Sequence, residues 1–414
     1  MDDTATASRQ GPLSHIRVLD LGRIMAAPWA TQMFADMGAD VVKIERLKTG
    51  DDTRNWGPPF LKDKDGNPTR ESGYYLSVNR GKRSVAVNIS SPEGQDIIRK
   101  LAMHSDIVIE NFKAGALQKY GLDSRSLRAL NPALIYCSLT GFGQDGPRRD
   151  QAAYDFAIQA MGGLMSITGQ RDDLPGGGPQ KVGIPIVDIM TGMYAAVAIL
   201  GALANRDRTG DGETIDLAMF DVAASMLSNQ AMNYLLSGRP PKRGGNRHPN
   251  IQPQDVFACR DGYFVLAVGN DGQFAKLCEA LQHPEWSSNE KFNTNASRVE
   301  NHAALMELLN VSFSSYDKLE ICSMLDRAGV PCAPINDIDQ VFSDPQLVHR
   351  AVLRQLPHPL SGTVPQVVSP FRFEGATLNF VNPPPQLGQH SDDVFAELGI
   401  DAQERARLAE RGVI

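Results

Sequence analysis

Residues 16–46 read IRVLDLGRIMAAPWATQMFADMGADVVKIER. Two short apolar runs, 16–22 and 40–46, flank a segment with helical spacing at 26–39, and Pro28 lies near the start of that segment. Proline is favoured in the first turn of a helix because the N–H group that it lacks would have no partner there. The stretch therefore predicts a strand, a helix and a second strand parallel to the first.

The same alternation continues to about residue 143. Apolar runs at 84–90, 106–112 and 133–143 are predicted to be strands, and a helix is predicted over 92–104, starting at Pro92. Strands that alternate with helices of this length indicate a doubly wound parallel sheet with right-handed crossovers. The fold class predicted for this part of the chain is therefore α/β and Rossmann-like.

The second half of the chain does not continue the regular alternation of short strands and helices. A strand and a long helix, which Asp221 could cap, are predicted over 213–238. Residues 239–254 are rich in Pro, Gly and basic side chains, which is typical of a linker or a functional loop. Residues 255–268 predict a hairpin that turns at Asp261-Gly262, and helical segments follow to about 328.

The composition is that of an ordinary globular protein, with 42% hydrophobic and 21% charged residues. The net charge of -7 disfavours a protein that coats nucleic acid, although it leaves room for a local basic patch. The longest apolar run, 182–204, is interrupted by Pro185, Asp188 and Gly192. It favours a buried helix over a membrane span, so neither nucleic acid nor membrane is an expected partner.

The cysteines and the N-terminal residues indicate in which cellular compartment the protein is expected. The five cysteines are scattered and show no zinc-site spacing, and the histidines are dispersed, so no metal is predicted. Reduced thiols of a cytoplasmic protein are the expectation. Residues 1–20 are mostly polar and lack the apolar core of a leader, so no signal peptide is predicted.

The turn after the first predicted strand indicates whether the chain could bind a dinucleotide. It reads GRIMAAP (22–28) and lacks the GxGxxG pattern that lets a pyrophosphate approach the backbone. Dinucleotide binding is therefore disfavoured, even though Glu45 lies near the position of a ribose-binding acid. The start of the following helix could still present N–H groups to an anion.

Asp188 stands out because it lies inside the apolar stretch VGIPIVDIMTGMYAAVAIL (182–200). A carboxylate in such surroundings costs several kcal/mol unless something satisfies it. Spacing alone leaves two roles open, the N-cap of a helix over 189–205 or a chemical role. Asp155, in AAYDFAIQ, is the chief competitor, and it also precedes an amphipathic segment that it could cap.

Several segments, taken together and in order, resemble the family III CoA-transferases, the group that contains formyl-CoA transferase and carnitine CoA-transferase. They are residues 18–46, 79–89, 108–122, 139–147, 154–169, 187–203, 246–257 and 387–399. The resemblance implies a Rossmann-like large domain, a smaller α+β domain and a C-terminal return to the large one. It also implies a homodimer of two interlocked subunits, acyl-CoA and small carboxylic acids as substrates, and no metal or redox cofactor.

The resemblance and the changes of sequence pattern along the chain together predict the domain boundaries. The first part of the large CoA-binding domain is expected in 1–225, and 226–245 is expected to be a linker. The small domain is expected in 246–335. Residues 336–414 are expected to form a return linker and the C-terminal part of the large domain.

The resemblance assigns the chemistry to Asp188. Residues VDIMTGM (187–193) match the family pattern of an Asp followed shortly by Ser/Thr-Gly-Met. The match implies that Asp188 attacks the acyl-CoA thioester to give a mixed anhydride, which CoA then converts to an aspartyl-CoA thioester. Both intermediates hydrolyse, so an apolar surround that excludes water is expected.

Two other functions stay open beside CoA transfer. The related acyl-CoA racemases exchange a proton next to the thioester carbonyl, using a histidine where Tyr154 stands here. Tyrosine, with an ordinary pKa of about 10, is a poor base near neutrality, so Tyr154 is expected instead to line the acyl pocket. The third possibility is a non-catalytic CoA-binding protein.

The resemblance also implies which residues contact CoA. Arg46 and Lys119 are expected to face its phosphates, and Lys119 replaces an arginine of some relatives. Lys82 and Arg83 are weaker candidates. The full set of expected CoA contacts is Ile24, Met25, Ala26, Arg46, Val78, Asn79, Arg80, Gly81, Asn111, Phe112 and Lys119.

The loop NRHPNIQ (246–252) is expected to select the acid. It is richer in side chains than the glycine-rich flap of formyl-CoA transferase and resembles members that act on dicarboxylates. Arg247 could pair with a second carboxylate, and Gln252 is a further substrate candidate. A basic surface loop fits the same residues, and His248 is not expected to be a base. The preferred donor is succinyl-CoA.

Overall fold

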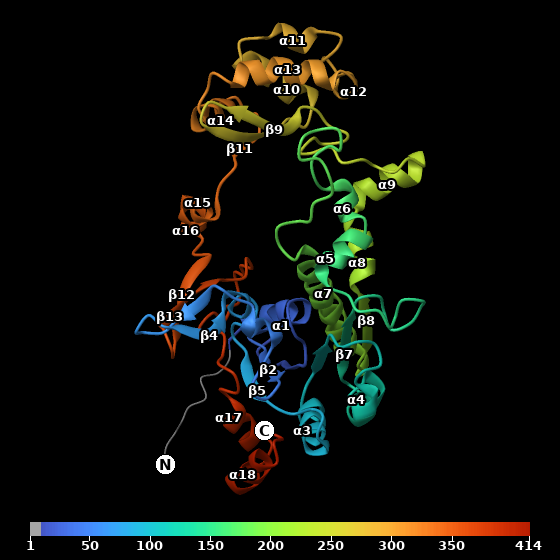
Figure 1. Ribbon diagram of the computed structural model, residues 1–414, viewed down its shortest axis with the longest axis vertical. Coiled ribbons are helices and arrows are strands. Elements are labelled where there is room, and N and C mark those ends of the chain that lie inside the picture. The colour runs from blue at the N-terminus through green and yellow to red at the C-terminus, as the bar shows by residue number, and fades with distance from the viewer. Residues whose placement is uncertain (1–9) are drawn as a thin grey trace. The chain divides into compact units, whose positions relative to one another are not determined.

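The computed structural model describes residues 10–414 (Figure 1), so residues 1–9 of the segment examined for a leader lie outside the described part of the chain. The chain forms two compact units. The first contains the described residues up to 164 together with 182–231 and 347–414, and the second contains 165–181 and 232–346. The predicted domain boundaries stay predictions.

A parallel six-stranded sheet forms the centre of the first unit. The chain builds it outward from β1 in one direction and then returns to add strands on the other side, so that β1 and β6 are neighbours at the reversal. The α/β prediction is confirmed. Across the sheet, the strands are β5 (Arg83–Ala86), β2 (Asp40–Glu45), β1 (Arg17–Asp20), β6 (Ile107–Glu110), β7 (Ile135–Thr140) and β8 (Thr214–Ala218).

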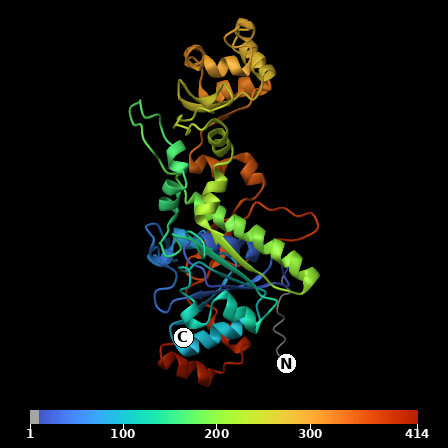
Figure 2. The same cartoon turned by 90° about the vertical axis from the view of Figure 1, so that its right-hand side faces the viewer.

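Helices cover both faces of this sheet because its buried strands are apolar on both sides. One core cluster joins the strands to α1 (Ala26–Asp36) and α7 (Ile186–Thr209), and α7 is the long yellow-green helix of Figure 2. The other cluster joins them to α3 (Pro92–Met103), α4 (Ser124–Leu130), α17 (Ser391–Glu397) and α18 (Ala402–Glu410). The predicted helices after Pro28 and Pro92 are therefore confirmed.

Helix α7 packs closely against α1. A Cβ atom at Gly192 would lie 2.6 Å from the carbonyl oxygen of Ala26, so only glycine allows this approach. The helix is long and apolar enough to cross a membrane by length and composition, but Ala195, Ile199 and Leu203 are buried in the core of the unit. The predicted helix is thus present with one face buried, and it ends at Thr209, before Gly210, whose φ of 82° is left-handed.

Hydrogen bonds to a buried ion pair attach the C-terminal segment to this core. The Arg80 guanidinium donates to Asp36 of α1 at 2.9 and 2.6 Å, and it also donates to Gln366 and to the carbonyl group of Val367. Arg80, Asp36 and Gln366 are buried, so loss of one partner of the Arg80–Asp36 pair would leave an uncompensated charge. The pairing fixes residues 347–414 onto the first unit.

Shorter elements complete the first unit. They are η1 (Asp52–Asn55), β3 (Phe60–Lys62), β4 (Pro68–Ser72), α2 (Gly73–Leu76), η2 (Gln118–Tyr120), α5 (Asp155–Met161), α8 (Met219–Met226), β12 (Leu353–His358) and β13 (Gly362–Val367). The chain passes between the units within α6 (Leu164–Ile167), α9 (Ser228–Ser237) and α16 (Pro345–His349).

The predicted long helix after 213–218 is instead two helices. Helix α8 ends before Ser228, whose φ of 46° is left-handed, and α9 begins at that residue. The expectation that Asp221 caps the helix is wrong, because the N-cap residue is Ala218 and Asp221 lies inside the first turn. Strand β8 runs directly into the helix and leaves no polar residue at the capping position.

The second unit is a small α+β structure around the rings of Phe257, Phe264 and Phe313. The predicted hairpin is present, but Cys259 pairs with Gly262, so its loop is Arg260-Asp261, one residue earlier than the predicted turn at Asp261-Gly262. Residues 239–253 form neither helix nor strand. The elements of the second unit are β9 (Gln254–Cys259), β10 (Gly262–Ala267), α10 (Asp271–Ala280), α11 (Glu285–Ser288), α12 (Asn295–Glu300), α13 (His302–Phe313), α14 (Lys318–Arg327), β11 (Cys332–Pro334) and α15 (Ile338–Ser343).

Candidate active site

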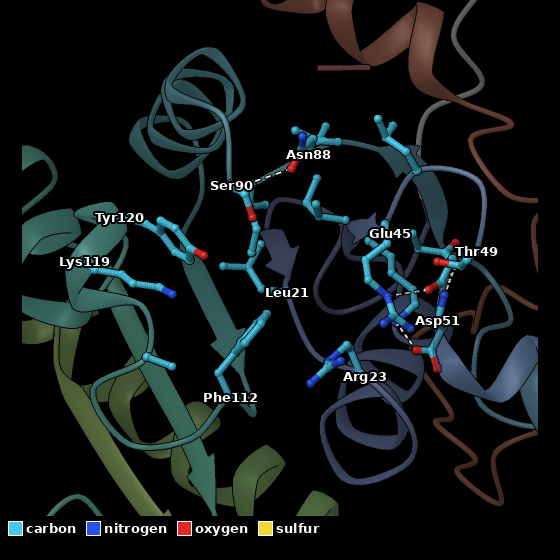
Figure 3. Close-up of a pocket in the computed structure, with 18 residues that line it drawn as sticks. Leu21, Arg23, Glu45, Thr49, Asp51, Asn88, Ser90, Phe112, Lys119 and Tyr120 are labelled. Atoms are coloured by element: carbon cyan, nitrogen blue, oxygen red, sulfur yellow. Dashed lines mark hydrogen bonds and ion pairs between the residues drawn. The ribbon is translucent and has the colours of Figure 1, made fainter. Parts of the chain in front are cut away.

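A cavity of about 510 Å³ opens at the carboxyl ends of β1, β2 and β6 (Figure 3). In doubly wound sheets, ligands bind at the point where the strand order reverses, and here that point lies between β1 and β6. The cavity is lined by Leu21, Arg23, Lys43, Ile44, Glu45, Arg46, Leu47, Thr49, Gly50, Asp51, Val87, Asn88, Ile89, Ser90, Phe112, Ala116, Lys119 and Tyr120.

A buried ion pair forms the floor of this cavity. Lys43 Nζ lies 2.9 Å from the Asp51 carboxylate and donates to the carbonyl oxygen of Gly22 at 2.7 Å. Asp51 in turn accepts the N–H groups of Ile24 and Thr53. Burial alone would raise the pKa of Asp51, but Lys43 and the hydrogen bonds outweigh it and hold the pKa well below its usual range.

These bonds shape the turn between β1 and α1. Ile24 has a φ of 69°, a left-handed conformation that is strained for a β-branched residue. Asn111 stabilises the same turn, because its Oδ1 accepts the N–H of Arg23 at 2.8 Å and its Nδ2 donates to the Arg23 carbonyl at 2.7 Å. Ile24 and Asn111 therefore shape the cavity without lining it.

Three cationic side chains reach the cavity from different elements. Arg46 and Arg23 both pair with Asp52, and Arg23 also lies over the Phe112 ring at 5.1 Å. Lys119 lies over the Tyr120 ring at 4.7 Å, across the cavity from Glu45 and Asp51 in Figure 3. A single exposed carboxylate does not neutralise three cations, so this rim favours a ligand with several negative charges.

Other predicted CoA contacts do not line the cavity. Met25 and Ala26 are buried where α1 begins. Val78, Asn79, Arg80 and Gly81 lie in the interior, where the Asn79 amide bonds Tyr75 and Lys82, and Arg80 bonds Asp36. The structure does not bring these residues to the cavity, because their polar side chains are already paired inside the fold.

The two weaker candidates are also committed to structural pairs. Lys82 is buried and bonds Asp20 at 3.1 Å, and burial lowers its pKa to about 8. Arg83 pairs with Asp40 and Glu397. Neither side chain lines the cavity.

Asp188 is the third residue of α7 and is half-buried. The capping alternative is wrong, because the helix begins at Ile186 with Pro185 at the N-cap position. The carboxylate of Asp155 instead accepts the N–H groups of Val187 at 2.7 Å and Asp188 at 3.1 Å. The Asp188 side chain makes no capping bond and is left for another role.

The surroundings of Asp188 make its carboxyl group unusually basic. Burial, and then the negative charge of Asp155, raise its pKa to about 7. Burial and the charges of Asp188, Asp155 and Asp51 raise the pKa of Tyr74, in α2, to about 12. The charges of Asp188 and Asp51 thus both act on Tyr74. Asp188 and the part of the cavity that Asp51 lines are therefore neighbours in the first unit.

The predicted substrate residues lie in both units. Tyr154 immediately precedes α5, and 64% of it is exposed. In the second unit, half-buried Arg247 donates to the carbonyl of Val299 at 3.2 Å. Gln252 is buried and its amide donates to the His248 carbonyl at 2.8 Å, so its side chain supports the loop from within.

Comparisons with known proteins identify the family of the chain. The family model described as "CoA-transferase family III" matches residues 13–391. A succinate–glutarate CoA-transferase of Agrobacterium fabrum is 46% identical over 95% of this chain and 98% of its own length. A human succinyl-CoA:glutarate CoA-transferase is 39% identical over 97% of this chain and 90% of its own.

A solved structure shows the same architecture. The crystal structure of a CAIB/BAIF family protein from Brucella suis superimposes with a TM-score of 0.83 at 46% identity, covering 94% of this chain and 100% of that one. Fold and sequence together define a CoA-transferase. The chain belongs to CoA-transferase family III, and the resemblance recognised in the sequence is confirmed.

Sequence reasoning missed several residues of the site. Arg23, Asp51 and Tyr120 line the cavity but were not singled out, and neither was Tyr74 beside Asp188. The signal for Arg23 and Asp51 was their position just after β1 and β2, since ligands gather at the carboxyl ends of parallel strands. No local pattern marks Tyr74 or Tyr120, which tertiary packing places.

The raised pKa of Asp188 predicts a pH-dependent effect of Asp188→Asn on stability. A raised folded-state pKa means that the fold favours the protonated carboxyl, so the contribution of Asp188 to stability is fully present below the ordinary aspartate pKa of about 4 and is lost as the pH rises through about 7. Allowing for screening by water, the variant should be more stable than wild type at pH 8 by roughly 2–4 kcal/mol.

Urea unfolding at pH 5 and pH 8 measures this difference. The advantage of the variant should shrink as the pH falls below 7. Asp207→Asn, which changes an exposed carboxylate in the last turns of the same helix, is the matched control and should show no such trend. A pH-independent difference for Asp188→Asn would contradict the assignment.

Proposed function

We propose that this protein transfers CoA from succinyl-CoA to a small dicarboxylic acid such as glutarate, through covalent intermediates on Asp188. One observation carries the proposal: a half-buried carboxyl group with a pKa of about 7 has no capping duty and neighbours a cavity rimmed by cations. The names of the two enzymes of Agrobacterium fabrum and Homo sapiens support succinate and glutarate as the acids.

In the proposed exchange, Asp188 carries first the acyl group of the donor, then CoA, and then the acyl group of the second acid. An Asp188 carboxylate oxygen attacks the thioester carbon of succinyl-CoA, the C–S bond breaks, and CoA leaves as the thiolate. The thiolate then attacks the Asp188 Cγ of the mixed anhydride, which releases succinate and forms an aspartyl-CoA thioester. The carboxylate of the second acid attacks Cγ and expels the thiolate, which finally attacks the new acyl carbon and frees Asp188.

The basicity of Asp188 suits this sequence. Nucleophilic strength rises with the proton affinity of the attacking oxygen, so a carboxylate with a pKa near 7 attacks more readily than an ordinary one. About half of the groups are still ionised at neutral pH, because the pKa and the pH coincide. The steps as a whole consume neither water nor a net proton, which agrees with an apolar surround.

We place CoA in the cavity of the first unit. Arg23, Arg46 and Lys119 carry the charges that would bind its phosphates, and the rings of Phe112 and Tyr120 offer apolar surface beside them. Ile24 and Asn111 support the turn that forms one wall. Direct contacts from residues 78–81 are not part of this proposal, because their polar side chains are paired elsewhere.

We assign the second carboxylate of the acid to Arg247. Its guanidinium is half-buried and makes one bond to the carbonyl of Val299. Burial and the charge of Arg171 lower its pKa, while Asp255 acts in the opposite direction, so an added carboxylate would relieve the repulsion between the two arginines. Tyr154, largely exposed, is proposed to line the acyl pocket.

Trapping with hydroxylamine tests the covalent chemistry. After incubation with succinyl-CoA, hydroxylamine should convert the activated Asp188 carboxyl to a hydroxamate, which peptide mass spectrometry locates. A folded Asp188→Ala protein should lose the adduct and all acid exchange. Exchange of the α-hydrogen for deuterium without an adduct would point to a racemase, and neither signal would point to a non-catalytic CoA-binding protein.

The choice of acid is tested in the same preparation. Diacids of four or five carbons should form CoA thioesters at least about tenfold faster than acetate or butyrate, because the Arg247 pair acts on the second carboxylate. Equal rates for diacids and monoacids would remove Arg247 from the assignment.

Lys119→Ala should weaken binding of succinyl-CoA. Loss of one charge-assisted contact should raise KM by about tenfold, and kcat should change little because the contact serves substrate and transition state alike. Lys113→Ala is the matched control, since Lys113 is exposed on the same segment but does not line the cavity. Steady-state kinetics measures both, and equal effects of the two variants would contradict the placement of CoA.

We further propose that the working form is a cytoplasmic homodimer of interlocked subunits. Along α7, Tyr194, Val197 and Leu200 form an exposed apolar stripe with helical spacing, which a second copy would cover. All five cysteines are free thiols, which suits a reducing compartment.

Val197→Asp tests the dimer. Val197 is 65% exposed, so in a lone chain the substitution should be harmless, but at a covered interface it would bury an unpaired charge. Sedimentation should find two chains per particle for wild type and a loss of that species for the variant. Val311→Asp, at a position 71% exposed in the second unit, should retain the wild-type mass, and a monomeric wild type would end the proposal.

A further inference from the structure

A second carboxylate, Asp155, is bound to the same helix turn that carries Asp188. Its Oδ1 accepts the N–H groups of Val187 and Asp188, which belong to the first turn of α7 and have no partner within the helix. Asp155 is itself the first residue of α5, so one side chain joins the starts of two helices. The backbone of Asp188 is therefore fixed by a group outside its own helix.

Gln159 holds Asp155 in place. This glutamine is buried, and its Nε2 donates to Asp155 Oδ2 at 2.5 Å, while its Oε1 accepts the N–H of Val182 at 2.9 Å. Both oxygens of Asp155 thus accept hydrogen bonds, from three donors in total. Because Gln159 lies one turn beyond Asp155 on α5, the helix sets the orientation of the carboxylate.

The arrangement gives the two carboxyl groups different tasks. Asp155 is surrounded by donors, whereas Asp188 lies at the end of the same turn with the negative charge of Asp155 beside it. Asp155 would thereby keep the neighbouring carboxyl group more basic than an isolated aspartate. Pairs of carboxyl groups whose environments separate their roles are a recurring device of catalytic sites.

We propose that Asp155, oriented by Gln159, is the positioning residue of this reaction: it fixes the first turn of α7 and tunes the Asp188 carboxyl group by its charge. The inference rests on the proposed nucleophilic role of Asp188. It separates a structural function, which any acceptor at this place can perform, from an electrostatic function, which needs the negative charge.

Other charged groups near α7 are accounted for. Asp155 is the charge that acts on Asp188, and Tyr74 of α2 faces it as a neutral phenol with a pKa of about 12. On the elements packed against α7, Asp36 of α1 pairs with Arg80, and Asp216 of β8 accepts the N–H of Gln144. Asp221 lies in the first turn of α8, and Cys137 of β7 is buried with a raised pKa.

The test compares Asp155→Asn with Asp155→Ala. The rate at which succinyl-CoA forms the covalent CoA adduct on Asp188 is measured by rapid quench and mass spectrometry from pH 5 to pH 8.5. The asparagine amide keeps an oxygen that can accept both N–H groups but removes the charge. Its plateau rate should stay within about threefold of wild type, and the acid limb of its pH profile should move to lower pH by about one unit.

The alanine variant loses the acceptor as well as the charge. Its plateau rate should fall by at least about tenfold, because the first turn of α7 is no longer fixed. Asp207→Asn, an exposed change in the last turns of the same helix, should leave both the plateau and the acid limb unchanged. Should Asp155→Ala fail to fold, the pH profile of Asp155→Asn decides the matter alone.

The outcomes separate this inference from the proposed function. If wild type forms no adduct on Asp188, the proposed function fails before Asp155 is tested. If wild type forms the adduct and the acid limb of Asp155→Asn coincides with that of wild type, the electrostatic role of Asp155 is refuted while the nucleophile stands. A shifted limb with a preserved plateau supports both roles of Asp155.

Discussion

The ion pair between Lys43 and Asp51 is the interaction on which the cavity depends. It lies beneath the turn between β1 and α1, where Lys43 also bonds the carbonyl of Gly22 and Asp51 bonds the N–H of Ile24. Without this pair, the left-handed Ile24 would lose the hydrogen bond from its N–H group to Asp51, and Asn111 alone would hold the turn. Two buried charges cost much to desolvate, but here each has further hydrogen bonds, which is the condition under which such a pair persists.

The same ion pair lies between the cations that we propose to bind CoA and Asp188, the proposed nucleophile. Asp51 and Asp188 both act on Tyr74, so the ion pair and the start of α7 share one neighbour. Charges of opposite sign are therefore separated. Cations lie at the rim of the cavity, and the carboxylates of Asp155 and Asp188 lie at the first turn of α7. This separation suits a substrate that is anionic at one end and carries an electrophilic carbon at the other.

An aspartate that accepts N–H groups at the N-terminus of a helix usually stabilises that helix, and Asp155 does so for α7. Asp188 lies two residues beyond the first of that helix and yields no such benefit, while its burial carries a cost. A fold retains an unfavourable group of this kind when the group serves function, and strained or destabilised positions concentrate at functional sites. The two carboxyl groups thus illustrate how a stabilising acid from α5 and a destabilising acid of α7 can meet at the start of one helix.

The sequence by itself determined the α/β class, the five strands and two helices predicted up to residue 143, the hairpin of β9 and β10 and the family, because these follow from local periodicity, turn residues and ordered motifs. It did not mark the short elements β3, β4, α2 and α4 of the same region. It also singled out Asp188, since a carboxylate in an apolar run is visible without a structure. Tertiary structure alone decided that Asp155 rather than Asp188 caps α7, that Arg80 pairs with Asp36, and that Lys43, Asp51 and Tyr120 meet at one cavity. Those outcomes depend on which side chains the crossovers of the sheet bring together over long separations in the chain, and no local pattern records that information.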